Sequence, residues 1–303
     1  MSTEIPYPMI RNEIRLSGRT IFLTRIRRRL LRDPALVFGW MIIVGVGLSA
    51  LFPTLLSPYD PNAQDLASRL LPPGGVDAGG GRHWLGTDWV GRDLLSRIAH
   101  GSRVSMSVAA FAVVVRVVLG SAVGMTSGFY GGLADTVFMR LADIQLALPF
   151  LLLAVAVAAV FGPSLLNVIL VLGVTGWMAY GRLVRAQVLS LREKEFVEAA
   201  RALGVADWQI ITRHILPNVL GSVIALAAVD VPALILAESS LSFLGVGVPM
   251  TTPSWGGMVA LGRNHLTTAW WVPVLPGLAI AVVVLGISLV GDWLRDELDP
   301  TLR

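Results

Sequence analysis

The sequence predicts an all-α polytopic membrane protein with six transmembrane helices. Hydrophobic residues make up 54% of the 303 residues and charged residues only 15%, whereas a soluble domain carries about 25% charged residues. Apolar runs of about 20 residues recur along the chain, and each is long enough to cross a bilayer. The runs do not alternate in polarity as the strands of a membrane barrel do, so we expect helices, whose backbone hydrogen bonds are internal.

Polar segments divide the apolar sequence into six predicted spans. The spans cover residues 35–57, 104–127, 144–162, 165–183, 219–243 and 272–291. Gly162-Pro163-Ser164 separates the third span from the fourth, which predicts a tight hairpin there. We therefore expect a first helix at 35–57, an outer loop at 58–103, and five further spans within residues 104–303.

The basic residues orient these helices, because cytoplasmic loops carry an excess of Arg and Lys. When the N-terminal segment 1–34 is placed in the cytoplasm, 17 of the 24 basic residues fall on the cytoplasmic side. Six fall in the outer loops 58–103 and 244–271, and Arg116 lies inside a span. Both termini are thus predicted to be cytoplasmic. The excess of basic residues behind the net charge of +4 is explained by this orientation and requires no nucleic-acid partner.

No catalytic or metal-binding group of residues stands out. The chain has no cysteine, which excludes disulfides, thiol nucleophiles and Cys-based zinc sites. The only lysine, Lys194, lies outside any phosphate-binding loop, so ATP is not bound in that way. We expect a non-catalytic chain without a cofactor. His83, Asp88 and Asp93 could be combined into a metal site, but Thr87 and Asp88 are better explained as caps of the next helix.

Three glycines in the second span predict close packing. Gly120, Gly124 and Gly128 recur every four residues, and a row of small residues lets a second membrane helix approach closely. We expect another helix to pack along this row. The alternative is that the glycines are simply tolerated in a membrane helix.

Residues 192–218 are too polar to span a membrane and too long for a simple turn. A first helix from Glu193 should end at Gly204, because glycine adopts positive φ without strain. Asp207 predicts the cap of a second helix, which Pro217 limits. Such a protruding pair of helices exposes apolar surface unless a partner covers it. A helix that lies on the lipid surface is the alternative.

This segment resembles the EAA loop of ABC importer permeases. The resemblance rests on Glu198-Ala199-Ala200, on Gly204 and on His214-Ile215-Leu216-Pro217. In that family the loop forms a coupling helix, which lies in a groove of a cytoplasmic ATPase. The general family pattern has an apolar residue where this chain has His214, and the variant here resembles the peptide-transporter branch. The resemblance implies coupling roles for Glu198, Ala199, Ala200, Gly204, Asp207, Leu216 and Pro217.

Other segments are similar to the dipeptide/oligopeptide/nickel permease family. They are His83–Asp88, Gly91–Asp93, Leu95–Arg97, Leu241–Gly245, Ser254–Gly256 and Gly291–Pro300. The additional first span resembles that of the C-type subunit. The resemblance implies a type I ABC importer permease fold, in which a five-helix core at 104–303 follows one extra helix. It also implies a location in the cytoplasmic membrane of a bacterium or archaeon.

The resemblance implies a function as the permease subunit of an ATP-driven importer of dipeptides or oligopeptides. Its partners would be a second permease subunit, two cytoplasmic ATPases that bind ATP and Mg²⁺, and an extracytoplasmic substrate-binding protein. The chain itself would bind no cofactor. The alternatives are an importer of nickel chelates or other small solutes, such as glutathione or opines, and a stand-alone secondary transporter. The last would need a path of ionisable groups inside the membrane.

Three ionisable residues and one tryptophan are candidates for the translocation path. Arg116 and Asp230 lie near the middle of their spans, where a lone charge costs about 2.5–3.5 kcal/mol. They could pair with each other, pair with the second permease, or line a watery path and meet the carboxylate and amine of a peptide. Glu238 is the third ionisable candidate. Trp255, between turn residues, is predicted to belong to an outer gate or to the dock of the binding protein.

Overall fold

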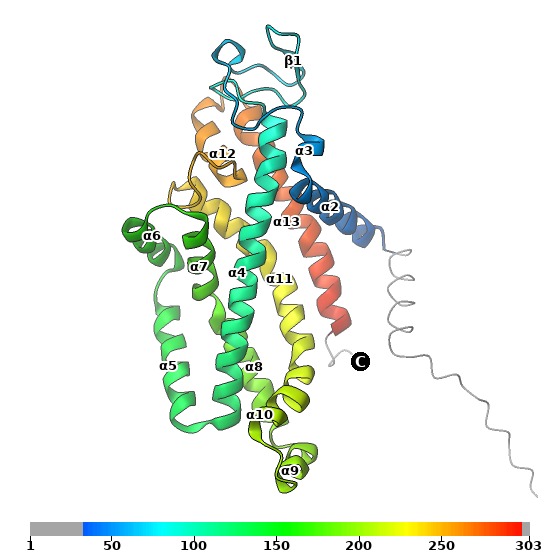
Figure 1. Cartoon of the computed structure of the whole chain (residues 1–303), viewed down its shortest axis with the longest axis vertical. Helices are drawn as coiled ribbons and strands as arrows, with labels where there is room; N and C mark the ends of the chain where they lie inside the picture. Colours follow the sequence, from blue (N-terminus) through cyan, green and yellow to red (C-terminus); the bar gives the residue numbers. More distant parts are fainter. Residues whose placement is uncertain (1–32, 299–303) are drawn as a thin grey trace, which may run out of the picture.

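The computed structural model describes residues 33–298 as an elongated bundle of helices (Figure 1). Five helical segments are long and apolar enough to cross a membrane, and a bent pair of helices supplies a sixth span if it is counted as one. This agrees with the six predicted spans. The predicted N-terminal segment 1–34 lies almost entirely outside the described residues, as do the last residues of the predicted core.

The first span is shorter than predicted. Helix α2 (Pro34–Leu51) ends before Pro53, and a separate turn of helix, α3 (Pro53–Leu56), follows. The prediction of one helix over 35–57 is wrong because proline disfavours helical backbone in the residue before it. α2 lies against α13 (Trp271–Leu298), where a Cβ on Gly39 would come within 3.0 Å of the Gly286 carbonyl oxygen.

The outer region between α3 and α4 is irregular, apart from a short ladder. It contains a 3₁₀ turn, η1 (Leu66–Ser68), and two antiparallel strands, β1 (Gly75–Val76) and β2 (Arg82–His83), in which Gly75 pairs with His83. α4 (Leu94–Tyr130) begins within the predicted outer loop 58–103, ten residues before the predicted span at 104.

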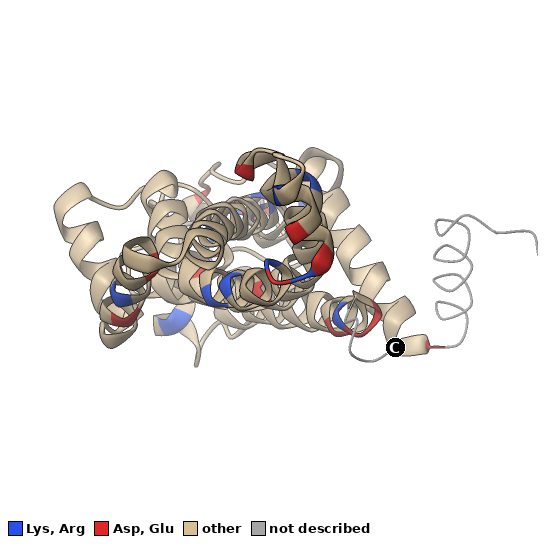
Figure 2. Cartoon of the chain, turned by 90° about the horizontal axis from the view of Figure 1, so that it is seen from below, with Lys and Arg blue, Asp and Glu red and all other residues tan. Residues whose placement is uncertain are grey.

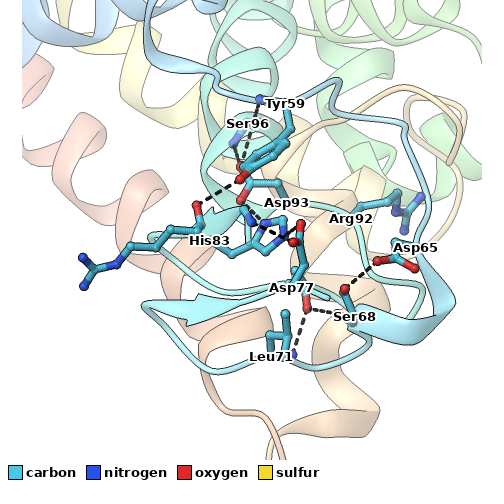
Figure 3. A network of polar contacts seen from close by, with 12 residues as sticks. Tyr59, Asp65, Ser68, Leu71, Asp77, His83, Arg92, Asp93 and Ser96 are labelled. Carbon is cyan, nitrogen blue, oxygen red and sulfur yellow. Dashed lines mark hydrogen bonds and ion pairs between the residues drawn. The ribbon is translucent and has the colours of Figure 1, made fainter. Parts of the chain in front are cut away.

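A buried polar network ties this outer region to the start of α4 (Figure 3). His83 Nδ1 lies 2.9 Å from an Asp93 carboxylate oxygen, and its Nε2 lies 3.5 Å from Asp77. Asp93 is the N-cap of α4, because it accepts from the Ser96 amide at 2.7 Å. The prediction of Thr87 and Asp88 as the caps is therefore wrong.

The side chains of Thr87 and Asp88 brace the loop instead. The Thr87 hydroxyl donates to the Ser68 carbonyl oxygen, and Asp88 accepts from Arg92 Nε at 2.6 Å. The Ser68 hydroxyl donates in turn to Asp65 and holds the pKa of that carboxyl below its ordinary value. The outer region is thus fixed by side-chain hydrogen bonds more than by regular structure.

Helix α4 is the centre of the bundle. It has 37 residues, which corresponds to about 55 Å, and it contacts α2, α5, α7, α8 and α11. The predicted glycine row packs on α8 (Trp177–Leu191): a Cβ on Gly120 would lie 2.5 Å from the Trp177 carbonyl oxygen, and one on Gly124 would lie 2.6 Å from that of Gly181. The prediction of close helix packing is confirmed.

The third predicted span is a bent pair. α5 (Gly132–Ala147) and α6 (Phe150–Phe161) meet at an angle of 89°. A straight helix over 144–162 and a loop over 128–143 are therefore wrong, because Pro149 breaks the helix and α5 occupies most of the predicted loop. The next hairpin is as predicted, with Gly162 at φ 76° and with Ser164 as the cap of α7 (Leu165–Thr175).

The fourth predicted span is broken at Gly176, which separates α7 from α8. The polar loop follows α8 and contains α9 (Glu195–Ala202). Then α10 (Asp207–Ile210), a π-helical turn η2 (Ile211–Ile215) and α11 (Leu216–Phe243) run on without interruption. Pro217 thus does not end a helix. A π turn is a wide turn, and here it accommodates the missing N–H of proline inside one long helix.

The last elements complete the bundle near the outer region. α12 (Trp255–Gly262) and a 3₁₀ turn η3 (Arg263–His265) lead into α13. Buried apolar side chains of α4, α7, α11, α12 and α13 form one core cluster, and a second cluster joins α8, α9, η2 and the start of α11. The second cluster connects the polar loop to the membrane helices.

Candidate functional site

The predicted coupling loop forms the end of the molecule that carries α9 and α10 (Figure 1). α9 ends in a Schellman motif, in which the Gly204 amide donates to the Arg201 carbonyl oxygen at 2.9 Å and the Val205 amide donates to that of Ala200 at 3.1 Å. Gly204 has φ 75°. The predicted end of the helix is confirmed, since this motif requires a residue at positive φ.

The predicted coupling residues divide into an exposed and a buried set. Glu198, Ala199, Gly204, Asp207 and Pro217 are exposed, whereas Ala200 is buried and Leu216 is half-buried. Asp207 is not the cap of its helix, because Ala206 takes the N-cap position and no side chain caps it. A carboxylate in the first turn still favours the helix, since the N-terminus of a helix carries partial positive charge.

Large apolar side chains on this loop remain uncovered. Leu203 is 82% exposed, Trp208 61% and Phe196 43%. Acidic and basic residues accompany them along the same end of the molecule (Figure 2). Apolar side chains within a rim of charges are typical of a surface that binds a partner.

Two arginines attach the loop to α4. Arg192 Nη1 donates to the Gly128 carbonyl oxygen at 2.9 Å, and the guanidinium of Arg201 lies 4.9 Å from the ring centre of Phe129. The first contact satisfies a carbonyl at the helix end, which has no partner within the helix. From the sequence, these arginines indicated only the orientation of the chain, because their partners lie more than 60 residues away.

Arg116 and Asp230 form an ion pair between α4 and α11. Arg116 Nη1 lies 2.8 Å and 2.9 Å from the two Asp230 carboxylate oxygens, and the Tyr180 hydroxyl donates to the same carboxylate at 3.0 Å. Of the three predicted arrangements, the structure has the pair within the chain. Tyr180 was not predicted, because nothing in its sequence context marks it.

The break between α7 and α8 lies against this pair. At the break the Gly176 amide donates to the Gly173 carbonyl oxygen and not to that of Leu172, four residues before it. The Leu172 carbonyl oxygen accepts from Arg116 Nε at 2.8 Å instead. A Cβ on Gly176 would overlap the Arg116 guanidinium. Gln145 of α5 satisfies a second carbonyl, that of Val174, at 2.7 Å. Irregular backbone at membrane depth is tolerated where protein groups replace its lost bonds or where it lines a cavity.

A cavity of about 400 Å³ opens beside the ion pair. Arg116, Asp230, Tyr180 and Gly176 belong to its wall. The other lining residues are Leu146, Phe150, Thr175, Met178, Ala179, Arg182 and Leu226. The volume lies in the range of about 300–1,000 Å³ that is usual for small-molecule sites, and an apolar wall with a few converging polar groups is also typical of them.

The other two predicted path residues do not line this cavity. Glu238 is fully buried, and its carboxylate accepts from Ser105 at 2.9 Å and from Ser242 at 2.8 Å. Trp255 is 1% exposed and donates from its indole to the Ile98 carbonyl oxygen at 3.0 Å. A side chain so buried cannot contact a docked protein in this conformation, so only the gate interpretation of Trp255 stays a prediction.

The discarded metal site does not assemble. Within residues 33–298, no group of three or more metal-binding side chains is gathered. His83 and Asp93 do meet, but Asp88 is engaged by Arg92 in a salt bridge of 2.6 Å.

Known proteins share both the sequence and the fold. Residues 120–303 match the family described as binding-protein-dependent transport system inner membrane component, and residues 22–73 match the N-terminal TM domain of oligopeptide transport permease C. The probable D,D-dipeptide transport system permease protein DdpC of Escherichia coli (strain K12) is 42% identical over 268 residues, which is 88% of each chain. The di/tripeptide transport system permease protein DppC of Pseudomonas aeruginosa (strain UCBPP-PA14) is 41% identical over 265 residues, again 88% of each chain.

A solved structure supports the same fold. A chain of the MetNI methionine ABC transporter in an inward-facing conformation superposes with a TM-score of 0.52 at 18% identity, over 67% of this chain and 96% of that one. Fold and matches together define a multi-span permease subunit of ABC importers. More particularly, the chain belongs to the binding-protein-dependent transport system inner membrane components, and its first helix is that of the oligopeptide permease C branch.

Proposed function

We propose that this chain is one permease subunit of an ATP-driven importer of dipeptides or other short peptides in a bacterial or archaeal cytoplasmic membrane. The observation that carries the proposal is the family match, together with relatives named as dipeptide and di/tripeptide permeases at 42% and 41% identity over 88% of the chain. The remaining partners are a second permease, two ATPases that bind ATP and Mg²⁺, and an outer substrate-binding protein.

The loop end faces the cytoplasm in this proposal, as do both termini. An ATPase covers the exposed apolar side chains of Leu203 and Trp208, together with Glu198, Ala199 and Asp207. Ala200, Gly204, Leu216 and Pro217 set the shape of the loop. Closure of the ATPase pair on ATP then pushes the loop as a rigid body, and the membrane helices alternate between inward-open and outward-open states.

Two arginines transmit this movement of the loop to the membrane helices. Arg192 and Arg201 hold the loop to the end of α4, at Gly128 and Phe129. α4 continues without a break to Leu94 at the outer end. A displacement of α9 therefore reaches the cavity and the outer region through one helix, where Trp255 contributes to a gate beside Ile98.

The test is to express the chain with its neighbouring permease, ATPase and binding-protein genes. We expect a tag on this chain to recover an ATPase, and we expect proteoliposomes to take up a dipeptide only with ATP and the loaded binding protein. The control is the same complex with an ATPase that cannot hydrolyse ATP. Uptake driven by an ion gradient without ATP would refute the proposal and favour a secondary transporter.

The same experiment separates substrates within the family. A nickel chelate, glutathione or an opine in place of the dipeptide would keep the importer mechanism and change the cargo. A secondary transporter is disfavoured by the geometry, because Glu238 is enclosed by serine hydroxyls and does not share a cavity with Arg116 and Asp230. A continuous path of ionisable groups is therefore not assembled within the described residues.

A further inference from the structure

The geometry points to a binding site for both charged ends of a short zwitterionic solute in the cavity around Arg116 and Asp230. Arg116 takes the carboxylate of the solute, and Asp230 takes its amine. The inference rests on the proposed function, because it assigns the groups that hold the cargo of an importer during its passage. It names a class of ligand, a small molecule with one free carboxylate and one free ammonium group.

The position of the pair in the wall of a cavity is the first support. The side chains of Arg116 and Asp230 keep 14% and 17% of their surface exposed, although both lie in membrane spans. Full enclosure would cost both charges their hydration. Here the charges instead face an opening of about 400 Å³.

The contacts of Arg116 allow its carboxylate partner to be exchanged. Nε is held by the Leu172 carbonyl oxygen, and Nη1 alone serves both oxygens of Asp230. Nη2 makes no hydrogen bond to any residue within 33–298. The guanidinium therefore stays in place without Asp230 and has donors left for a second carboxylate, whose planar geometry it matches.

Asp230 also keeps a partner when the pair opens. The Tyr180 hydroxyl donates to one of its oxygens at 3.0 Å, so the carboxylate keeps a hydrogen-bond donor. An arriving ammonium group then replaces Arg116 as its counter-ion. One internal ion pair becomes two pairs with the solute, and no charge is left unpaired in the membrane.

The local break in the fourth span is the second support. Gly176 separates α7 from α8 beside Arg116, and a Cβ there would overlap the guanidinium unless that side chain shifted. The carbonyl oxygens of Leu172 and Val174 are satisfied by Arg116 and Gln145. Discontinuous helices are the common means by which transporters build a substrate site near the middle of the membrane.

The test measures uptake per ATP hydrolysed by the complete importer in proteoliposomes, with alanylalanine and its C-terminal amide as probes. Uptake per ATP is used because the binding protein has a preference of its own. We expect the wild type to favour the free acid by about tenfold or more, as for loss of one hydrogen-bonded charge. Arg116→Gln alone would leave Asp230 unpaired, so the main variant is the double substitution Arg116→Gln with Asp230→Asn, which removes both charges.

The double variant should move the acid and the amide with equal yield while its ATPase still responds to the binding protein. Arg116→Lys, which keeps the charge, should still favour the acid. The matched control is Arg185→Gln with Asp135→Asn, an ion pair between α8 and α5 outside the cavity wall, and it should keep the wild-type preference.

Two outcomes would overturn the inference. The first is wild-type preference for the acid in the double variant, which would make the pair a packing contact. The second is loss of the preference in the control as well, which would make it a property of helix packing in general. Absence of any ATP-dependent uptake by the wild type would refute the proposed function itself, and this result is distinct from both.

Discussion

Replacement of Gly204 by valine should uncouple the ATPase from transport while the chain still inserts and assembles. Gly204 closes the Schellman motif of α9 at φ 75°. A Cβ at this position would meet nothing within 4 Å, so the cost of substitution comes from the backbone and not from a clash. An L-residue in the left-handed region costs about 1–2 kcal/mol, and a β-branched one costs more because its rotamers are restricted.

The size of this cost sets the expected effect. About 1–2 kcal/mol reduces the population of the native turn relative to alternatives by roughly 5–30-fold. The second cluster of buried residues holds Val197, Ala200 and Ile210 together, so the loop stays folded near them but α9 changes direction. Uptake should fall several-fold, with a smaller loss of binding-protein-dependent ATPase activity, because hydrolysis proceeds without a productive push.

A series at this one position separates backbone strain from side-chain size. Asparagine tolerates the left-handed region, so Gly204→Asn should retain most uptake, Gly204→Ala should be intermediate and Gly204→Val should be lowest. The assay is ATP-dependent uptake in proteoliposomes at equal amounts of complex. Full uptake by Gly204→Val would refute the reasoning, and so would a loss in Gly204→Asn equal to that in Gly204→Val.

Three further predictions use other parts of the structure. Gly124→Leu should abolish assembly, because its Cβ would press on the backbone of α8, whereas Gly45→Leu, which meets nothing within 4 Å, should give normal yield on size-exclusion chromatography. Arg192→Gln should lower uptake per ATP two- to tenfold (on the order of one charged hydrogen bond) in the same proteoliposome assay. Trp84→Cys, 57% exposed, should react with an impermeant thiol reagent from outside far faster than Trp255→Cys, 1% exposed. Labelling of Trp84→Cys from the cytoplasmic side alone would reverse the proposed orientation.

Features set by local sequence were predictable. The helix end at Gly204 and the hairpin at Gly162 follow from residues that tolerate positive φ, and both have it, at 75° and 76°. The packing of Gly124 on α8 follows from a spacing of four. These signals need only a few neighbouring residues, so a single sequence carries them.

Features set by distant partners were not predictable. The breaks at Pro149 and Gly176 occur in apolar sequence that reads as continuous helix, and the π turn that carries the helix past Pro217 lies where the sequence predicted a helix end. Membrane helices tolerate such residues when neighbouring helices satisfy the freed backbone groups. At Gly176 the partner is Arg116, 56 residues away from the carbonyl that it binds, and no local pattern contains that information.

The position of Arg116 on α4 unites the two candidate sites. The same helix carries Gly128 and Phe129 at the loop end, Arg116 beside the cavity, and begins at its cap, Asp93, in the outer network. A push on the loop would reach α4, an unbroken helix of about 55 Å with no proline, and also α11, which continues from the loop through η2. α11 has Pro232 two residues beyond Asp230, where the helix can bend. A bend of α11 at Pro232 that carried Asp230 away from α4 would open the ion pair, as the proposed solute site requires.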